Sequence, residues 1–338
     1  MTGTAAPWMI DRAIYPESTP REQLRFLLSY AILAPSTHNT QPWQFTVLDD
    51  RIELWADTSR LLPRIDPERR QLHMSCGAAL MNLRIAMRCH GNLDEVAYLP
   101  DEARPDLLAV LKRGDAAAPS ARDLDLFDAI PRRRTNRDPF RDTPIGQNLA
   151  DEIMAEAANE QAWMVRLHPF QKLDVADAIA KADQRQYADQ SYRDELAEWL
   201  VPRGSMRHDG IPMTKRDVAT TLPLLAPLAV RLLDRGDTVA AHEAALTVQA
   251  PMIAVLGTEL DDPLAWLWAG EALEAVFLHA TGDGVAMSFL NQVVEDPELR
   301  RAVATATNHD GFPQLVLRFG YGPEQTPTPR RSIGEMMR

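Results

Sequence analysis

The sequence predicts an α+β fold built from two diverged copies of one unit, arranged in tandem and paired as an internal pseudo-dimer. Its 338 residues are enough for about two domains. The helical phrase Gly-Ala-Ala-Leu at Gly77 returns as Gly-Glu-Ala-Leu at Gly270. A weaker echo relates Asn-Thr-Gln-Pro-Trp at 39–43 to Asn-Glu-Gln-Ala-Trp at 159–163, in the same order along the chain. A chance match of two alanine-rich amphipathic helices is the alternative explanation of the first pair.

The first copy is expected over residues 1–113 and begins with a helix whose start is marked by Thr19. This cap hydroxyl is followed by a proline at the first helical position and by a glutamate that can complete a capping box. Two apolar runs on either side of an aspartate pair predict a hairpin. A longer run with helical spacing of apolar residues predicts a helix that ends near a glycine. These elements are expected at 44–48 and 51–56 (strands), 69–90 (helix), and 95–99 and 107–112 (strands).

The second copy is expected over residues 123–338, after a small, polar, alanine-rich linker at 114–122. Residues 184–233 have no counterpart in the first copy and hold several aromatic side chains. We expect them to form an inserted, lid-like segment that covers a site, or else a peripheral helical hairpin. The other elements of this copy are expected at 149–158 and 263–281 (helices) and at 164–168, 252–257 and 314–320 (strands).

Composition disfavours several classes of protein. Asp plus Glu outnumber Lys plus Arg by 48 to 36, which argues against generic nucleic-acid binding. Cys76 and Cys89 are too few for a disulfide scaffold and lack the spacing of zinc ligands. We recognise neither a secretory signal pattern nor an apolar run long enough to span a bilayer. The expectation is therefore a cytoplasmic protein that acts on a small molecule and binds neither membrane nor nucleic acid.

Two polar segments stand out, whereas familiar catalytic signatures are missing. The chain has no dinucleotide-binding glycine fingerprint, no Walker loop, no complete zincin pattern and no serine elbow. Residues 34–43 (Ala-Pro-Ser-Thr-His-Asn-Thr-Gln-Pro-Trp) place short hydroxyl and amide side chains in a loop that leaves a helix. Residues 132–137 (Arg-Arg-Arg-Thr-Asn-Arg) offer guanidiniums that could bind an anion. A capped turn and a solvated charge run are the respective alternatives.

Together with the strand at 312–322 and the basic pair Arg330-Arg331, these segments resemble the nitroreductase superfamily. Further phrases make the chain more similar to the Acg subfamily of duplicated, single-chain, nitroreductase-like flavoproteins. They are Asp66-Pro67, Ser75-Cys-Gly-Ala-Ala-Leu80, Arg134-Thr-Asn-Arg137 and Ser288-Phe-Leu-Asn-Gln292. The resemblance covers about residues 21–331 and implies a nitroreductase-like fold, with FMN bound where two units meet.

The resemblance also implies which residues hold the cofactor. Arg133, Arg330 and Arg331 match ligands of the phosphate. Thr135 matches a ribityl or phosphate contact, and Arg137 matches the cation near the N1/O2 edge of the flavin ring. The implied set comprises Pro35, Ser36, Thr37, Asn39, Gln41, Arg133, Thr135, Arg137, Met287, Ser288, Phe289, Leu290, Arg330 and Arg331. No metal and no catalytic side chain are expected, because the flavin carries the chemistry.

The two copies supply different parts of the implied FMN site. The first copy has the polar loop and the second has the arginine segment, so we expect one FMN per chain and one degenerate site. The resemblance implies an NAD(P)H-dependent oxidoreductase with ping-pong hydride transfer through flavin N5 to a nitroaromatic, quinone or similar acceptor. FMN storage with a covered flavin, and a flavin-dependent dehydrogenase of a specialised metabolite, are the alternatives. Because the copies are fused, the site is compatible with a monomer or a homodimer.

Overall fold

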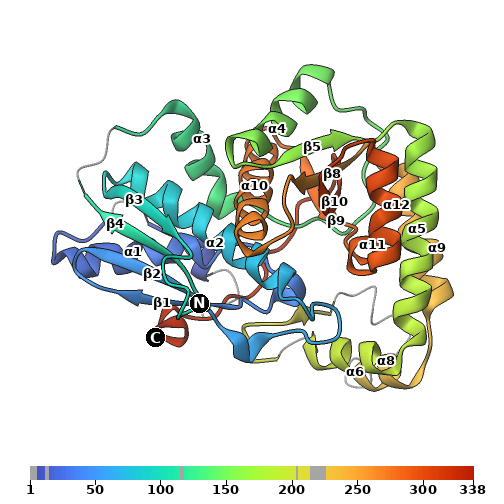
Figure 1. Ribbon diagram of the computed structural model, residues 1–338, viewed down its shortest axis with the longest axis horizontal. Helices are drawn as coiled ribbons and strands as arrows, with labels where there is room; N and C mark the ends of the chain where they lie inside the picture. Colours follow the sequence, from blue (N-terminus) through green and yellow to red (C-terminus); the bar gives the residue numbers. More distant parts are fainter. Residues whose placement is uncertain (1–5, 12–14, 115–117, 203–204, 214–225) are drawn as a thin grey trace.

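The computed structural model describes residues 6–11, 15–114, 118–202, 205–213 and 226–338. The first half holds a four-stranded antiparallel sheet with the strand order β1-β2-β4-β3. Helices α1 and α2 pack against this sheet, and α3 packs against α2 (Figure 1). The elements are α1 (Pro20–Ala31), β1 (Trp43–Val47), β2 (Arg51–Ala56), α2 (Arg70–Cys89), β3 (Leu93–Tyr98), β4 (Leu107–Arg113) and α3 (Ala121–Ala129).

The second half holds another four-stranded antiparallel sheet, with the order β5-β8-β10-β9. Its elements are α4 (Gln147–Asn159), β5 (Trp163–Arg166), β8 (Met252–Thr258), α10 (Pro263–Gly282), β9 (Ala286–Phe289), α11 (Gln292–Glu295), α12 (Pro297–Thr307) and β10 (Phe312–Gly320). In both halves a helix, two strands, a long helix and two strands follow one another in this order. The strand orders also correspond, since the last strand of each set lies inside the sheet and the third lies at its edge.

The start of each sheet repeats a local conformation. Trp43 is the first residue of β1 and Trp163 is the first residue of β5. Two residues before each tryptophan, Gln41 and Gln161 both adopt a left-handed backbone, with φ of 52° and 58°. Such a conformation is uncommon for a residue other than glycine. The two loops are therefore similar in backbone conformation as well as in sequence.

An additional segment lies between β5 and β8. Helices α5 and α9 pack together along one side of the molecule, and α6 and α8 lie at one end of this pair (Figure 1). The elements are α5 (Pro169–Ala188), α6 (Gln190–Trp199), β6 (Leu200–Val201), β7 (Ile211–Pro212), α8 (Ala226–Leu232) and α9 (Gly236–Gln249). Residue 184, where we expected an insertion to begin, lies inside α5. Residues 214–225 of that insertion, and 115–117 of the expected linker, lie outside the described residues.

The two halves meet where α2 crosses α10, and the crossing is reciprocal. A Cβ atom on Gly77 would lie 2.2 Å from the carbonyl oxygen of Leu267, and one on Gly270 would lie 2.1 Å from that of Met74. Each glycine thus faces the carbonyl oxygen of the residue that lies three positions before the other glycine. This reciprocity is typical of a contact related by a two-fold axis. The absence of side chains lets the helix backbones approach closely. The matched phrases in the sequence are thus the surfaces that hold the halves together.

Replacing Gly77 with alanine is expected to destabilise the protein by about 1–3 kcal/mol, because the new methyl group would overlap a backbone oxygen that cannot rotate away. The midpoint of urea unfolding would measure this loss. Gly282→Ala is the matched control, since nothing lies within 4 Å of a Cβ at that position near the end of α10. Equal midpoints for the two variants would contradict the close approach of the helices.

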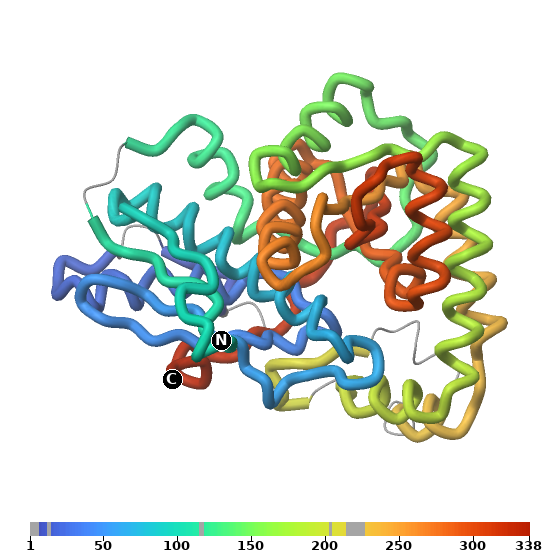
Figure 2. Tube along the Cα trace, in the orientation of Figure 1, coloured from blue at the N-terminus to red at the C-terminus, as the bar shows by residue number. Residues whose placement is uncertain are grey.

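The C-terminal segment returns from β10 to the first half (Figure 2). Met337 forms a parallel bridge with Phe45, and the Arg338 amide donates to the Phe45 carbonyl at 2.9 Å. Residues 321–332, which follow β10, therefore run between the halves. No described helix is long and apolar enough to cross a membrane.

A buried network of charges also joins α2, α4 and α10. Arg84 forms ion pairs with Glu160 at 2.7 Å and Glu271 at 2.5 Å, and the Tyr98 hydroxyl donates to Glu271 at 2.9 Å. The side chain of Glu271 is 1% exposed. A carboxylate buried this deeply requires a partner, because desolvation otherwise penalises its charge. Arg84 thus couples the two halves electrostatically.

Beside this network, His279 lies between Glu156 at 3.1 Å and Asp283 at 3.3 Å. The hydrogen bond to Glu156 raises the pKa of His279 above its usual value. A raised pKa stabilises the fold below pH 6.5, and this contribution is lost as the pH rises through the raised value. The loss of melting temperature in His279→Gln is therefore expected to be larger at pH 6 than at pH 9. A loss of the same size at both pH values would contradict this pairing.

Candidate functional site

A cavity of about 380 Å³ opens between the two halves. Its size falls within the range of small-molecule and cofactor sites. Its walls come from the loop after α1, the start of α2, the segment before α4, strands β9 and β10, the C-terminal segment and the helices between β5 and β8. The predicted residues that line it are Pro35, Ser36, Thr37, Asn39, Arg133, Thr135, Arg137, Ser288, Phe289 and Arg330. Segments from both halves and from the C-terminal segment therefore meet in one site.

The loop after α1 is held in an unusual conformation. His38 and Asn39 both have positive φ values, of 51° and 54°. The Ser36 hydroxyl accepts a hydrogen bond from the Gln41 amide at 2.9 Å, and the Thr37 hydroxyl donates to the side chain of Gln71 at 2.7 Å. These bonds fix the loop against α2, so that its short polar side chains face the cavity.

One end of the cavity is rich in buried arginine. Arg133 is 2% exposed and Arg330 is 4% exposed, and each donates to the carbonyl of Leu33, at 2.8 and 3.1 Å. Glu274 lies 3.3 Å from the Arg133 Nε but is oriented too poorly for a hydrogen bond. Nε and Nη1 of Arg133 and Nε of Arg330 have no hydrogen-bond partner among the described residues. Buried donors without partners indicate a missing acceptor.

The charges at this end do not balance. Burial lowers the pKa of Arg330 well below its usual range, and the neighbouring Arg133 and Arg134 lower it further. Burial raises the pKa of Glu274 to about 7, so this carboxyl only partly offsets the three guanidiniums. A compact anion would relieve the repulsion and satisfy the free N–H groups. We therefore call Arg133, Arg134 and Arg330 the arginine end of the cavity.

Trp8 lies against the arginine end. It is 5% exposed and lines the cavity, and its ring lies 3.9 Å from the Arg134 guanidinium carbon. Its indole N–H donates to the Thr328 carbonyl at 2.8 Å. Trp8 is not predictable from the sequence, because the short segment that carries it has no periodic pattern and no motif.

Residues 135–137 form a second part of the cavity wall, to which Thr135 and Arg137 contribute side chains. Thr135 forms a parallel bridge with Met287, and the Asn136 amide donates to the Met287 carbonyl at 3.0 Å. Arg318 on β10 donates to the Asn136 carbonyl at 3.1 Å and so fixes this segment against the second sheet. Burial and the Arg137 guanidinium lower the pKa of His38 to about 4, so that its imidazole is neutral at pH 7. This part of the wall therefore combines the Arg137 cation, the neutral His38 imidazole and the ordered backbone of residues 135–137.

The helices between β5 and β8 supply a third wall with acidic and aromatic side chains. Tyr187 and Tyr192 lie edge to face with their centroids 5.6 Å apart, and both line the cavity. Asp183 is 4% exposed, and burial raises its pKa to about 7, with Glu243 and Glu295 adding to the shift. The aromatic content of 184–233 was the available signal for this wall. Asp183 was missed because it precedes that range.

Four predicted residues do not line the cavity. Leu290 lies fully buried in the core beside β10, and Met287 is fully buried and contributes backbone contacts instead. Gln41 is fully buried, and its side-chain nitrogen donates to the His208 carbonyl at 2.8 Å. The fourth is Arg331, which directly follows the cavity-lining Arg330. The Arg331 guanidinium does not line the cavity and has other partners.

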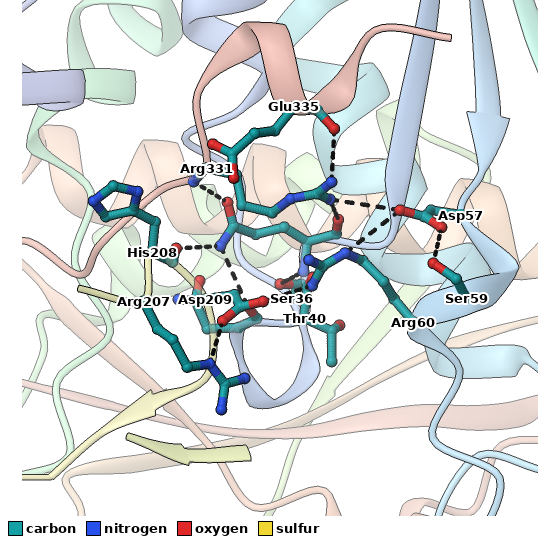
Figure 3. Close-up of polar contacts among 12 residues, drawn as sticks. Ser36, Thr40, Asp57, Ser59, Arg60, Arg207, His208, Asp209, Arg331 and Glu335 are labelled. Carbon is teal, nitrogen blue, oxygen red and sulfur yellow. Dashed lines mark hydrogen bonds and ion pairs between the residues drawn. The ribbon is translucent and has the colours of Figure 1, made fainter. Parts of the chain in front are cut away.

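Figure 3 shows the partners of Arg331. Its guanidinium donates to the Gln41 carbonyl at 3.2 Å and to the Glu335 carbonyl at 2.7 Å, and it lies 3.6 Å from Asp57. Arg60 lies in the same cluster and pairs with Asp209 at 2.9 Å. These contacts join the C-terminal segment to β2 and to the segment after β6. The structure thus gives Arg331 a structural environment where a phosphate contact was expected.

Comparisons with known proteins agree on one family. The nitroreductase family profile matches residues 11–74. The putative NAD(P)H nitroreductase Rv3131 of Mycobacterium tuberculosis is 33% identical over 325 residues, which cover 94% of this chain and 91% of that protein. The putative NAD(P)H nitroreductase acg of the same organism is 26% identical over 320 residues, 93% of this chain and 94% of that protein.

Among solved structures, the FMN-dependent nitroreductase NfnB from Mycobacterium smegmatis in complex with NADPH matches with a TM-score of 0.41 and 15% identity. The match covers 64% of this chain and 97% of that one. The identity to Rv3131, in contrast, extends over almost the whole length of both proteins. The resemblance inferred from the loop, the arginine segment and the C-terminal basic pair is thus confirmed, and the chain belongs to the nitroreductase family.

Proposed function

We propose that the chain binds one FMN in this cavity and acts as an NAD(P)H-dependent oxidoreductase on a nitroaromatic, quinone or similar acceptor. The observation that carries the proposal is the arginine end, where buried N–H groups lack acceptors at a closed wall of a cavity. A phosphomonoester has close to two negative charges at pH 7 and three acceptor oxygens. The three guanidiniums and the partly ionised Glu274 match that charge.

The rest of the cavity fits the remainder of FMN. Ser36, Thr37 and Thr135 offer hydroxyl groups suited to a ribityl chain between the arginine end and residue 137. Arg137 would lie at the edge of the flavin ring where negative charge develops on reduction, and a fixed cation there favours the reduced form. FMN, when bound, supplies the acceptance and donation of hydride. No acid or base from the protein is then required, and neutral His38 would add no charge beside the ring.

We also propose that the two halves are duplicated units and that only one of the two related sites binds FMN. The alignment of residues 39–43 with 159–163 pairs Ser36 with Glu156 and Thr40 with Glu160. Both carboxylates bind Arg122, at 2.7 and 3.2 Å. These carboxylates replace hydroxyl side chains of the first loop, and because they already bind an arginine they offer neither free hydroxyl groups nor a cation to a flavin nucleotide. This supports one FMN per chain, within a site that needs no second subunit.

A storage function is the alternative, and one observation favours it. Tyr187, Tyr192, Ile211 and Pro212, all from the segment between β5 and β8, line the cavity. If these side chains cover the flavin ring, the nicotinamide of NAD(P)H cannot stack on it and hydride transfer is blocked. If they move aside, the same segment acts as a lid that closes on the substrate.

An anaerobic absorption titration separates these functions. The purified protein, loaded with FMN, would be titrated with NADPH and then NADH, with dithionite as the final addition. Rapid bleaching by a nicotinamide supports the oxidoreductase. Bleaching by dithionite alone supports storage. A protein that neither contains nor takes up FMN would overturn both.

A further inference from the structure

We infer that Trp8 determines cofactor specificity: it closes the arginine end to ligands longer than a phosphomonoester, and so selects FMN over FAD. The inference rests on the proposed FMN site. It concerns a part of the cavity wall that Trp8, alone among residues 6–11, supplies and that belongs to neither sheet. Its basis is how tightly the indole is held and where it lies relative to the arginines.

Two hydrogen bonds connect Trp8 to the C-terminal segment and to the arginine end. The indole N–H donates to the carbonyl of Thr328 at 2.8 Å. The Thr328 hydroxyl accepts a hydrogen bond from Arg330 at 2.6 Å. The residue that fixes Trp8 therefore also fixes a guanidinium of the arginine end.

The ring of Trp8 also contacts all three guanidiniums. Their central carbons lie 3.9 Å (Arg134), 4.8 Å (Arg330) and 5.7 Å (Arg133) from its centroid. Cations within about 6 Å of an indole ring are attracted to its face, and the attraction increases when they are desolvated. The indole is only 5% exposed. The arginine end is thus a closed wall made of a ring with cations arranged around it.

This wall distinguishes the two flavin nucleotides by length and charge. FMN ends at its phosphate, so three oxygens can accept from the guanidiniums and no group has to continue outward. FAD continues through a second phosphate to a ribose and an adenine, and its first phosphate has one charge instead of two. To bind in the same register, FAD would have to displace Trp8, losing the bond to Thr328 and the contacts with the arginines. We expect the wild-type chain to prefer FMN by about 100-fold or more, from the sum of these contacts.

The test uses the full chain dialysed free of flavin and titrated with FMN and with FAD, with quenching of flavin fluorescence as the readout. Trp8→Ala is expected to lower the FMN-to-FAD affinity ratio at least about 10-fold, mainly because FAD binds more tightly. Trp55→Ala is the matched control. Trp55 is 7% exposed and contacts Arg104 and Arg338, but it does not line the cavity, so the ratio should not change.

The outcomes separate the inference from the proposed function. Wild-type protein that binds no FMN would overturn the proposed function. Wild-type protein that binds FMN and FAD equally, or a Trp8→Ala variant with an unchanged ratio, would overturn the inference alone. An equal loss of affinity for both flavins would also overturn it, since that result indicates a purely structural side chain. If Trp8→Ala does not fold, Trp8→Leu also removes the indole with its bond to Thr328 and its contacts with the guanidiniums, and the FMN-to-FAD affinity ratio should again fall, although by less.

Discussion

Replacing Arg133 with methionine is expected to weaken FMN binding by about 100-fold or more. Arg133 is buried, with two N–H positions without partners at the arginine end. Two charge-assisted hydrogen bonds to a phosphate contribute about 1.5–3 kcal/mol each, which corresponds to at least two orders of magnitude in affinity. Methionine keeps most of the volume of the side chain and removes the charge. Fluorescence titration with FMN would measure the loss.

The design of this experiment must account for Glu274. Without Arg133 the carboxyl group loses its nearest cation while it stays fully buried. Because burial already raises its pKa to about 7, Glu274 can bind a proton and limit the cost to folding. The double variant Arg133→Met, Glu274→Gln removes both charges and should fold at least as well as the single variant. It should bind FMN as weakly, since the phosphate contacts remain absent.

Arg331→Met is the matched control for Arg133→Met. Both arginines are at most 8% exposed, and both were expected to hold the phosphate. The guanidinium of Arg331 instead contacts Asp57 and the carbonyls of Gln41 and Glu335. We expect this variant to lose stability but to keep its FMN affinity. Equal losses of affinity in the two variants would contradict the assignment of the arginine end.

Replacing Arg84 with methionine is expected to cost about 3–5 kcal/mol of unfolding free energy. The substitution removes the shared partner of Glu271 and Glu160, whose side chains are 1% and 5% exposed. Breaking a buried ion pair from one side is far more costly than losing an exposed one, because the remaining charge stays desolvated. Urea unfolding followed by circular dichroism would measure the difference.

The deficit of Arg84→Met should depend on pH. Burial raises the pKa of Glu271, and Arg84 is the main group that opposes this shift. In the variant the folded carboxyl binds protons more tightly than the unfolded one, so stability falls as the pH rises through the raised pKa. The deficit should therefore be smaller at pH 5 than at pH 8. Arg185→Met is the control, since its pair with Asp296 is also 2.7 Å long but exposed, and its midpoint should hardly change. A deficit for Arg84→Met no larger than that of this control would contradict the buried network.

Much of the fold followed from local patterns. The helix at 69–90 and the helix at 263–281 were predicted within one residue at each end, because a long helix packed on a sheet needs a periodic apolar face. The hairpin of β1 and β2 was predicted from its strands and turn. Helices α5 and α9 were not predicted, because they are alanine-rich and only weakly amphipathic. Helix α5 packs against the core of the second sheet, and α9 packs against α5. Only tertiary packing shows that they form a pair.

The site was partly predictable for a similar reason. Its loop and arginine segment are dense in functional groups and therefore visible in the sequence. Arg330 lines the cavity, whereas the guanidinium of its neighbour Arg331 is held by the carbonyls of Gln41 and Glu335, which a basic pair in the sequence does not reveal. Glu274 could have been found, because a carboxylate within an apolar helix requires a partner. Trp8 could not, since its role comes from contacts with residues more than 120 positions away.

The central claim is that one chain forms one FMN site from its own two halves. The most direct test is the stoichiometry of FMN binding by isothermal titration of flavin-free protein, together with its molar mass in solution. We expect one FMN per chain, whatever the oligomeric state, and no binding to the related position where Glu156 and Glu160 hold Arg122. Two FMN per chain would show that the second site is intact. One FMN per two chains would show that the site is built between subunits, and either result would contradict the account.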